Sequence, residues 1–225
     1  MPRWRDAFRS AAPLALVSLL VTLLRLAGEL RGWSDAWFSR ATSGLVPVGA
    51  VSWLVGITWL ALPFGAWLAW RLHRSGATPA GSASRAVLVA IAAVAGLYAG
   101  TRLVPLLGLA PPTFLLAIWT VGVLTALVAW QAWPALGRVL LAYGLLSRVP
   151  VAVVMLLAMA GHWGTHYDYA DTPQVQELPF WTAFFALAFI PQLVFWVAFT
   201  VVTGMLAGTV VAALRRGPPA RGGSQ

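Results

Sequence analysis

The chain has 225 residues, of which 60% are hydrophobic and only 9% are charged, with a formal net charge of +9. These proportions exclude an ordinary soluble domain, and the absence of Cys excludes disulfides, thiolate metal sites and cysteine nucleophiles. The positive charges lie in short segments between apolar runs rather than on one exposed face, which argues against nucleic-acid binding.

Six apolar runs are long enough to cross a bilayer, which takes roughly 20 residues of helix. The runs do not alternate between polar and apolar residues, so helices are predicted rather than a β-barrel. The expected spans cover about residues 10–30, 46–70, 85–108, 113–133, 135–160 and 181–214. The sequence therefore predicts an all-α polytopic membrane bundle with six transmembrane helices, forming a single integral membrane domain over residues 1–225.

The segment after the first span, residues 28–44, predicts a short interfacial helix at about 34–43. Ser34 is a suitable N-cap, and Gly44 can end the helix. Trp33 and Trp37 lie one turn apart, which is typical of an aromatic belt anchored at the lipid headgroups.

The middle spans contain a faint internal duplication. Residues 66–70 and 129–133 both have the pattern Ala-Trp-x-Ala-Trp, at the ends of the second and fourth spans. In each following span a Tyr precedes an Arg by about one turn and a Pro comes shortly after, around Arg102 and Arg148. This pattern indicates two hairpins related as parallel repeats, as in some transporters. Coincidence in a sequence rich in Ala, Leu, Val, Trp and Gly explains it equally well.

The last span is longer than a bilayer requires. A continuous helix over 181–214 would measure about 50 Å at 1.5 Å per residue, so it must tilt, project into water or break. Pro191 is the expected kink site because it lacks an N–H group and clashes with the preceding turn. Further on, the small residues Gly204 and Gly208 are spaced for close helix packing, within the chain or in a homodimer or partner complex.

The placement of Arg predicts the orientation in the membrane, because cytoplasmic loops carry the excess of positive charge. Arg residues cluster before the first span, between the second and third, between the fourth and fifth, and after the last. With six spans, these segments share one side, so both termini are predicted to be cytoplasmic and the loop over 161–180 to be outside. The exclusive use of Arg is typical of a GC-rich genome, so we expect a multi-pass protein of a bacterial inner membrane.

Charged residues within spans are costly in lipid and therefore suggest function. Arg148 lies deep in the fifth span, Arg102 in the outer half of the third, and Arg25 one turn before Glu29 near the outer end of the first. One carboxylate cannot neutralise three guanidinium groups, which suggests an anion site opening outward and lined by Arg148 and Arg102. An internal lock, in which Arg148 pairs with Glu29 or an outer-loop acid, is the competing interpretation. The neighbours expected to add hydrogen bonds are Tyr98, Tyr143 and Gln192.

The outer loop holds the densest set of candidate metal ligands: His162, His166, Asp168 and Asp171. Imidazole and carboxylate groups together suit zinc or another divalent ion. Trp163 stands where the catalytic Glu of a His-Glu-x-x-His zinc protease would be, so that reading fails. The alternatives left are a bound divalent metal, an acid-sensitive gate, or simply a polar cap on the bundle.

The sequence thus favours binding or passage of a small anionic or amphipathic solute, with the prolines at 150 and 191 as hinges. A non-catalytic membrane subunit or assembly factor is the first alternative, and a membrane enzyme using the loop around His162, His166 and Asp168 is the second. No Ser-His-Asp arrangement or Lys for a Schiff base is present, so the sequence favours a role other than catalysis and leaves the enzyme as the second alternative. No cofactor is expected beyond a divalent metal, and the lipid bilayer is the expected environment.

Overall fold

The computed structural model describes residues 3–40, 51–169 and 177–215, and within them helices are the only regular secondary structure, with no strand. Five of the helical segments are long and apolar enough to cross a membrane, which defines a multi-pass helical membrane protein. They are α1 (Trp4–Leu30), α3 (Ala83–Leu103) with its 3₁₀ extension η3 (Val104–Leu107), α4 (Pro111–Trp130), α5 (Pro134–Gly161) and the continuous helical segment Phe180–Leu214.

The second predicted span is not a continuous membrane-crossing helix. Its first residues, 46–50, lie outside the described part of the chain, and the next ten form two short 3₁₀ turns, η1 (Ser52–Val55) and η2 (Thr58–Leu60). Helix α2 (Ala61–Arg74) then has only 14 residues, or about 21 Å. Gly56 has an extended backbone between the two turns, which ends the first of them. The prediction of six spans is therefore not confirmed.

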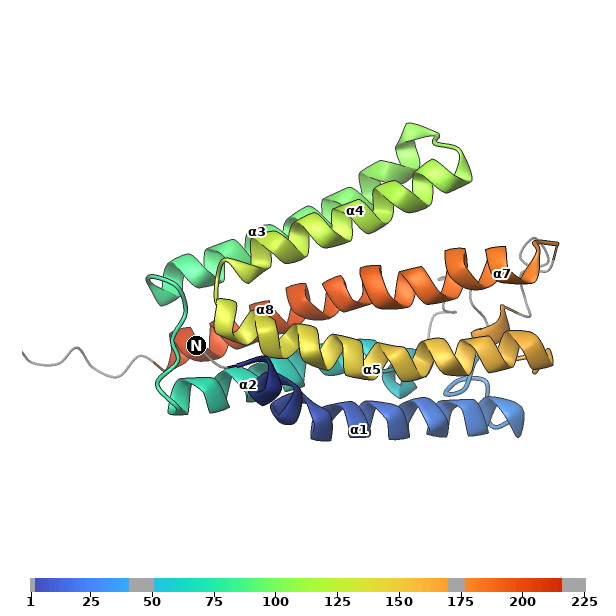
Figure 1. Ribbon diagram of the computed structural model, residues 1–225, viewed down its shortest axis with the longest axis horizontal. Coiled ribbons are helices and arrows are strands. Elements are labelled where there is room, and N and C mark those ends of the chain that lie inside the picture. Colours follow the sequence, from blue (N-terminus) through green and yellow to red (C-terminus); the bar gives the residue numbers. More distant parts are fainter. Residues whose placement is uncertain (1–2, 41–50, 170–176, 216–225) are drawn as a thin grey trace, which may run out of the picture.

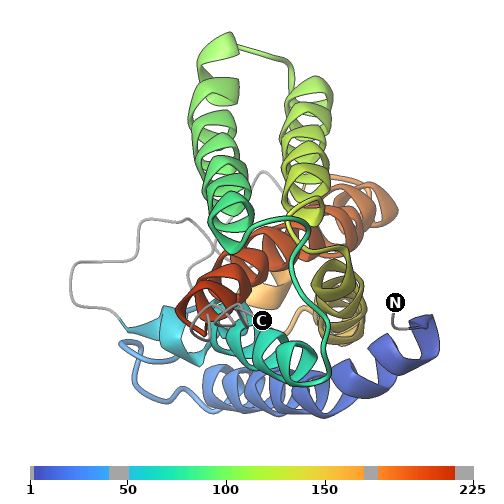
Figure 2. The same ribbon diagram turned by 90° about the vertical axis from the view of Figure 1, so that its left-hand side faces the viewer.

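Helix α5 lies at the centre of the molecule, packed between α1 and α8 (Trp196–Leu214), while α2 packs along α8 (Figure 1). Helices α3 and α4 form a hairpin that contacts α8 and leans away from the rest of the bundle, as Figure 2 shows. The hairpin buries little: among the residues of α4, only Gly122 and Ala129 are buried. The apolar surface that the hairpin exposes suits contact with lipid.

The close packing of α2 on α8 depends on three glycines. A Cβ atom at Gly65 would lie 2.5 Å from the Cα atom of Gly204, and one at Gly208 would lie 2.9 Å from the Cβ atom of Ala69. The predicted small-residue pair Gly204 and Gly208 is thus buried within the chain, where it lets two helices approach closely. A homodimer or a partner helix would need a different surface.

The last span contains the predicted irregularity near Pro191, in the form of π-helix rather than a sharp break. The segment begins as α7 (Phe180–Ala183), widens into the π-helical turns η5 (Phe184–Phe189) and η6 (Pro191–Phe195), and continues as α8. Pro191 has no N–H to close a normal helical turn, so a wider turn accommodates it. The turn places Gln192 among the buried residues. Pro150, the other predicted hinge, lies inside the unbroken helix α5.

The predicted interfacial helix over 34–43 is not formed by its described residues. Residues 34–40 make a single turn, in which the N–H groups of Trp37 and Phe38 both donate to the carbonyl of Ser34. Trp33 packs edge-on against Phe38 and stays partly exposed, as expected of a residue at the membrane surface. Residues 41–43 lie outside the described part of the chain.

The first turn of α1 and the last turn of α8 lie at the same end of the bundle (Figure 1). The α2–α3 and α4–α5 connections lie at that end too, so the predicted sorting of Arg-rich segments to one end agrees with the ribbon. The cytoplasmic assignment of that end remains a prediction. The internal repeat is not confirmed, because the short helix α2 packs mainly on α8, whereas the longer α4 packs on both α3 and α8.

Candidate functional site

A polar cavity of about 250 Å³ lies between α1, α5, the π-helical turn η6 and the irregular segment before α2. The 3₁₀ turn η4 (His166–Asp168), at the end of the bundle opposite the first turn of α1, contributes His166 and Tyr167 to its lining. Non-helical backbone at membrane depth is tolerated where it lines such a cavity, which accounts for the irregular residues 55–58. The lining residues are Thr22, Arg25, Val55, Gly56, Ile57, Thr58, Arg148, Val151, Met155, His166, Tyr167, Tyr169, Gln192 and Trp196.

Arg148 is the central group of the cavity. It lies in the middle of α5, about 20 Å along the helix from either end, and only 4% of its surface is exposed. Its Nη1 donates to Gln192 Oε1 at 3.3 Å and its Nη2 to Thr58 Oγ1 at 3.3 Å. The guanidinium carbon lies 5.1 Å from the ring centre of Trp196, a cation–π contact. The Nε group is buried without a hydrogen-bond partner.

Arg25 lies in the same cavity but in a different electrostatic setting. Its Nε donates to Glu29 Oε1 at 2.9 Å, one turn along α1, and its Nη2 donates to the Ser39 carbonyl at 3.3 Å. The Glu29 side chain is fully buried, whereas 14% of the Arg25 side chain is exposed. Arg40 donates to the backbone carbonyl of Glu29. The carboxylate therefore neutralises Arg25.

His166 joins this pair from the outer loop. Its backbone N–H donates to Glu29 Oε2 at 3.0 Å, and its Nδ1 lies 2.6 Å from Glu29 Oε1. Burial lowers the pKa of His166, although contact with Glu29 opposes the shift. The imidazole is consequently neutral at pH 7 and adds no positive charge to the cavity.

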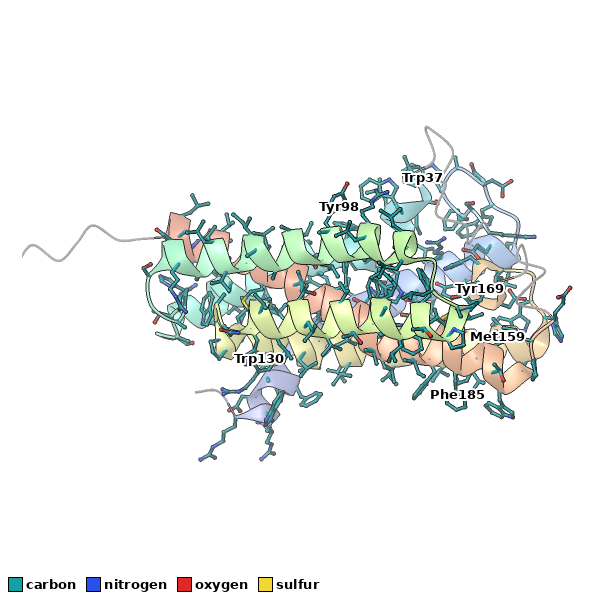
Figure 3. The ribbon with its side chains drawn as sticks, turned by 90° about the horizontal axis from the view of Figure 1, so that it is seen from above. Trp37, Tyr98, Trp130, Met159, Tyr169 and Phe185 are labelled. Atoms are coloured by element: carbon teal, nitrogen blue, oxygen red, sulfur yellow. The ribbon has the colours of Figure 1, made fainter. Side chains whose placement is uncertain are left out.

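The loop that carries His166 is held by a capping box. Asp168 Oδ1 accepts from the backbone N–H of Thr165 at 2.6 Å and from its hydroxyl at 2.9 Å, and Oδ2 accepts from the N–H of Gly164 at 2.9 Å. Tyr169 donates its hydroxyl to the Leu187 carbonyl at 2.6 Å, which ties the end of the loop to η5. Burial raises the pKa of Tyr169 to about 12, so its hydroxyl stays protonated. Figure 3 labels Tyr169 near Met159 at this end of the bundle.

The charges around the cavity do not balance. Glu29 is engaged by Arg25 and His166, and Asp168 caps its own loop. Within residues 3–40, 51–169 and 177–215, no carboxylate lies within 4.0 Å of Arg148. A lock between Arg148 and either Glu29 or Asp168 is therefore not present, and Asp171, the third partner considered, lies outside the described residues.

The structure brings together some of the predicted site residues and separates others. Arg148, Arg25 and Gln192 line the cavity, and Glu29 lies directly behind Arg25. Tyr143 is buried but is not among the residues that line the cavity, and its hydroxyl oxygen lies 2.9 Å from that of Ser18. Arg102 does not reach the cavity.

Arg102 lies instead on the exposed face of the α3–α4 hairpin. Its guanidinium carbon lies 5.3 Å from the ring centre of Tyr98, which is 64% exposed. Figure 3 shows Tyr98 on the outer side of α3, pointing away from the bundle. The prediction that Arg102 and Arg148 line one site therefore does not match their positions.

The predicted metal ligands are also dispersed. His166 faces Glu29, Asp168 caps the loop, and His162 is exposed at the end of α5. Among the residues that the structure describes, no three His, Asp or Glu side chains are grouped as a metal site would require. Because Asp171 is not among them, the divalent metal stays a prediction.

Several important lining residues carried no signal in the sequence. Thr58 binds Arg148 from a segment predicted to be ordinary helix, and Trp196 resembles the other tryptophans of an aromatic-rich chain. Met155 accepts from Gln192 Nε2 at 3.5 Å, and nothing in the sequence distinguishes it from the other apolar residues of its span. The seven-residue spacing from Arg148 to Met155 places both on one face of α5, which is the one signal that could have linked them.

Comparison of the chain with protein-family models, with curated proteins and with solved structures finds no match.

Proposed function

We propose that the protein binds a small anion in the cavity around Arg148 and provides a route for it through the membrane. The observation that carries the proposal is the charge of Arg148, which is buried at mid-helix and faces no carboxylate of the described residues. A buried charge without a counter-charge is strongly unfavourable. An anionic ligand would supply that counter-charge and satisfy the free Nε group.

The lining also supports a particular class of ligand. With Arg25 neutralised by Glu29 and His166 uncharged, the cavity carries one net positive charge, which suits a monoanion. Apolar groups from Ile57, Val151 and Met155 form the remaining wall, and a volume of about 250 Å³ limits the size. A small carboxylate with a short apolar chain meets these conditions.

Passage, as well as binding, is supported by the two interrupted segments beside Arg148. The 3₁₀ turns before α2 and the π-helical turns before α8 both contact the cavity. In secondary transporters, substrate sites form near the membrane midplane where helices are discontinuous. The irregular segments of this chain contact Arg148 through Thr58 and Gln192, beside the middle of α5.

The test is calorimetric titration of the detergent-purified protein with straight-chain monocarboxylates from acetate to hexanoate, and with succinate. The wild type and the Arg102→Gln variant should bind a monocarboxylate, whereas Arg148→Gln should bind it at least about tenfold more weakly, as expected for loss of a charge-assisted contact. The Arg102→Gln variant is the matched control because it removes the same charge from the exposed hairpin. Equal binding by both variants, or none by the wild type, would contradict the proposal.

A further inference from the structure

A second site lies at the opposite, Arg-rich end of the molecule, between the end of α2 and the end of α8. A groove of about 520 Å³ runs between the two helices and is mostly apolar. Its floor and walls come from Ala66, Trp67, Trp70, Val211, Leu214 and Arg215. Leu214 is 81% exposed, so the groove is open to the surface of the molecule at this residue. Its apolar lining can accept a hydrocarbon chain.

Three guanidinium groups lie against the two tryptophan rings that line this groove. Arg71 lies over the ring of Trp67 at 4.9 Å, and Arg74 lies over the ring of Trp70 at 5.0 Å. Arg215, from the other helix, lies 5.8 Å from the same Trp70 ring centre. Arg74 and Arg215, from different helices, therefore both place their guanidinium groups close to the Trp70 ring.

These charges are not neutralised by the part of the chain that the structure describes. No carboxylate of residues 3–40, 51–169 or 177–215 lies within salt-bridge distance of Arg71, Arg74 or Arg215, and all three are exposed. An anion bound close to these like charges would reduce their mutual repulsion. The indole rings themselves are of the kind that lies at the headgroup level of a membrane.

We propose that this groove binds an anionic phospholipid, with its phosphate between Arg74 and Arg215 and an acyl chain along Val211 and Leu214. Charge complementarity selects an anionic headgroup, and Arg binds phosphate through paired N–H donors. The apolar groove adjoining the charges selects a lipid rather than free phosphate. This inference is independent of the anion cavity around Arg148.

The positive charges of this end are not equivalent. Arg5 and Arg9 are exposed on the first turns of α1 and have no tryptophan ring beneath them among the cation–π contacts of the described residues. They suit a general role in orientation and provide a control with the same change in net charge. The double variants Arg74→Gln/Arg215→Gln and Arg5→Gln/Arg9→Gln therefore separate a built site from a general charge effect.

Native mass spectrometry of the purified full chain, with equal amounts of dioleoyl phosphatidylglycerol and dioleoyl phosphatidylcholine, measures the preference directly. Wild type and the Arg5→Gln/Arg9→Gln variant should both retain bound phosphatidylglycerol in preference to phosphatidylcholine. Arg74→Gln/Arg215→Gln should lose about 10-fold to 30-fold in affinity for it, the effect expected of two charges near a membrane surface. Retention by that variant, or equal loss in both, would overturn the proposal.

A second pair of measurements tests the lipid assignment. Val211→Trp fills the groove without changing a charge and should also weaken phosphatidylglycerol binding, which keeps the test informative if the double Arg variant does not fold. Glycerol phosphate, which has the headgroup chemistry but no acyl chain, should compete poorly. Full competition by glycerol phosphate, together with unaltered binding to Val211→Trp, would mean that the site takes a free phosphate and would overturn the lipid assignment.

Discussion

Two arginines with similar sequence neighbours lie in opposite environments. Arg148 on α5 and Arg102 on α3 each follow a Tyr by about one turn and precede a Pro within three residues. The first is buried beside a polar cavity, whereas the second is exposed on a hairpin that leans away from the bundle. The position of the helix in the bundle, rather than the local sequence, decides which arginine can face a ligand.

The bundle and the α3–α4 hairpin differ in the polar groups that they bury. The bundle buries Glu29, Arg148 and a hydrogen-bonded loop, so each of these polar groups depends on its partners. The hairpin buries mainly small apolar residues and presents its larger ones to lipid. Substitutions should therefore have larger and more specific effects in the bundle than in the hairpin.

The largest effect is expected at Glu29. Glu29→Gln removes the charge that neutralises Arg25 and should lower the free energy of unfolding by about 3–5 kcal/mol, the range for breaking one side of a buried ion pair. Denaturant unfolding in mixed micelles measures it. Glu177→Gln, at an exposed position, should change stability by less than about 0.5 kcal/mol. Comparable stability of the two variants would contradict the assigned role of Glu29.

A smaller effect is expected where glycine allows two helices to touch. Gly65→Ala would place a Cβ against the backbone of Gly204, which cannot move aside, and should cost about 1–3 kcal/mol. Gly96→Ala in the hairpin meets only a methyl group of Thr125 at 3.3 Å, so the gain in helix propensity should leave it neutral or slightly stabilising. If thermal unfolding shows that both variants behave alike, the α2–α8 contact is looser than described.

The smallest of the three effects concerns pH. The pKa of His166 is lowered in the folded protein, so protonation favours the unfolded chain. The stability that this group contributes is complete above its ordinary pKa near 6.5 and is lost as the pH falls below it. The charged or titratable neighbours are Glu29, Arg25 and Asp168.

Thermal unfolding between pH 8 and pH 5 should therefore show a steeper loss for the wild type than for His166→Gln. The exposed His162 provides the matched control, and His162→Gln should follow the wild-type profile. A wild-type profile with the same slope as that of His166→Gln would show that the imidazole does not couple to folding.

Much of the fold follows from hydropathy, because five apolar runs became helices of the predicted type. The second run failed as a continuous span because hydropathy cannot distinguish a helix from an apolar segment of 3₁₀ turns around Gly56. The irregularity at Pro191 could be predicted from the missing N–H group, although its π-helical form could not.

The charged residues of the site could be predicted from the sequence, but most of the residues that contact them could not. Arg148, Arg25 and Glu29 stand out as charges in apolar runs, and the i, i+4 spacing of the last two predicts their pairing. The contact between Glu29 and His166 joins residues 137 positions apart, so no local pattern reveals it. The same holds for Thr58 and Arg148, which approach each other only because the 3₁₀ segment enters the bundle.

The most direct test of the central claim compares the thermal unfolding of wild type and Arg148→Gln, each with and without a monocarboxylate at about 100 times its Kd. Because a buried charge without a counter-charge is unfavourable, an unpaired Arg148 predicts that Arg148→Gln is at least as stable as the wild type without ligand. The ligand should then stabilise only the wild type, by about 2.7 kcal/mol. Strong destabilisation of the ligand-free variant, with no shift of the wild type by any monocarboxylate, would show that Arg148 is a structural lock and would contradict the account.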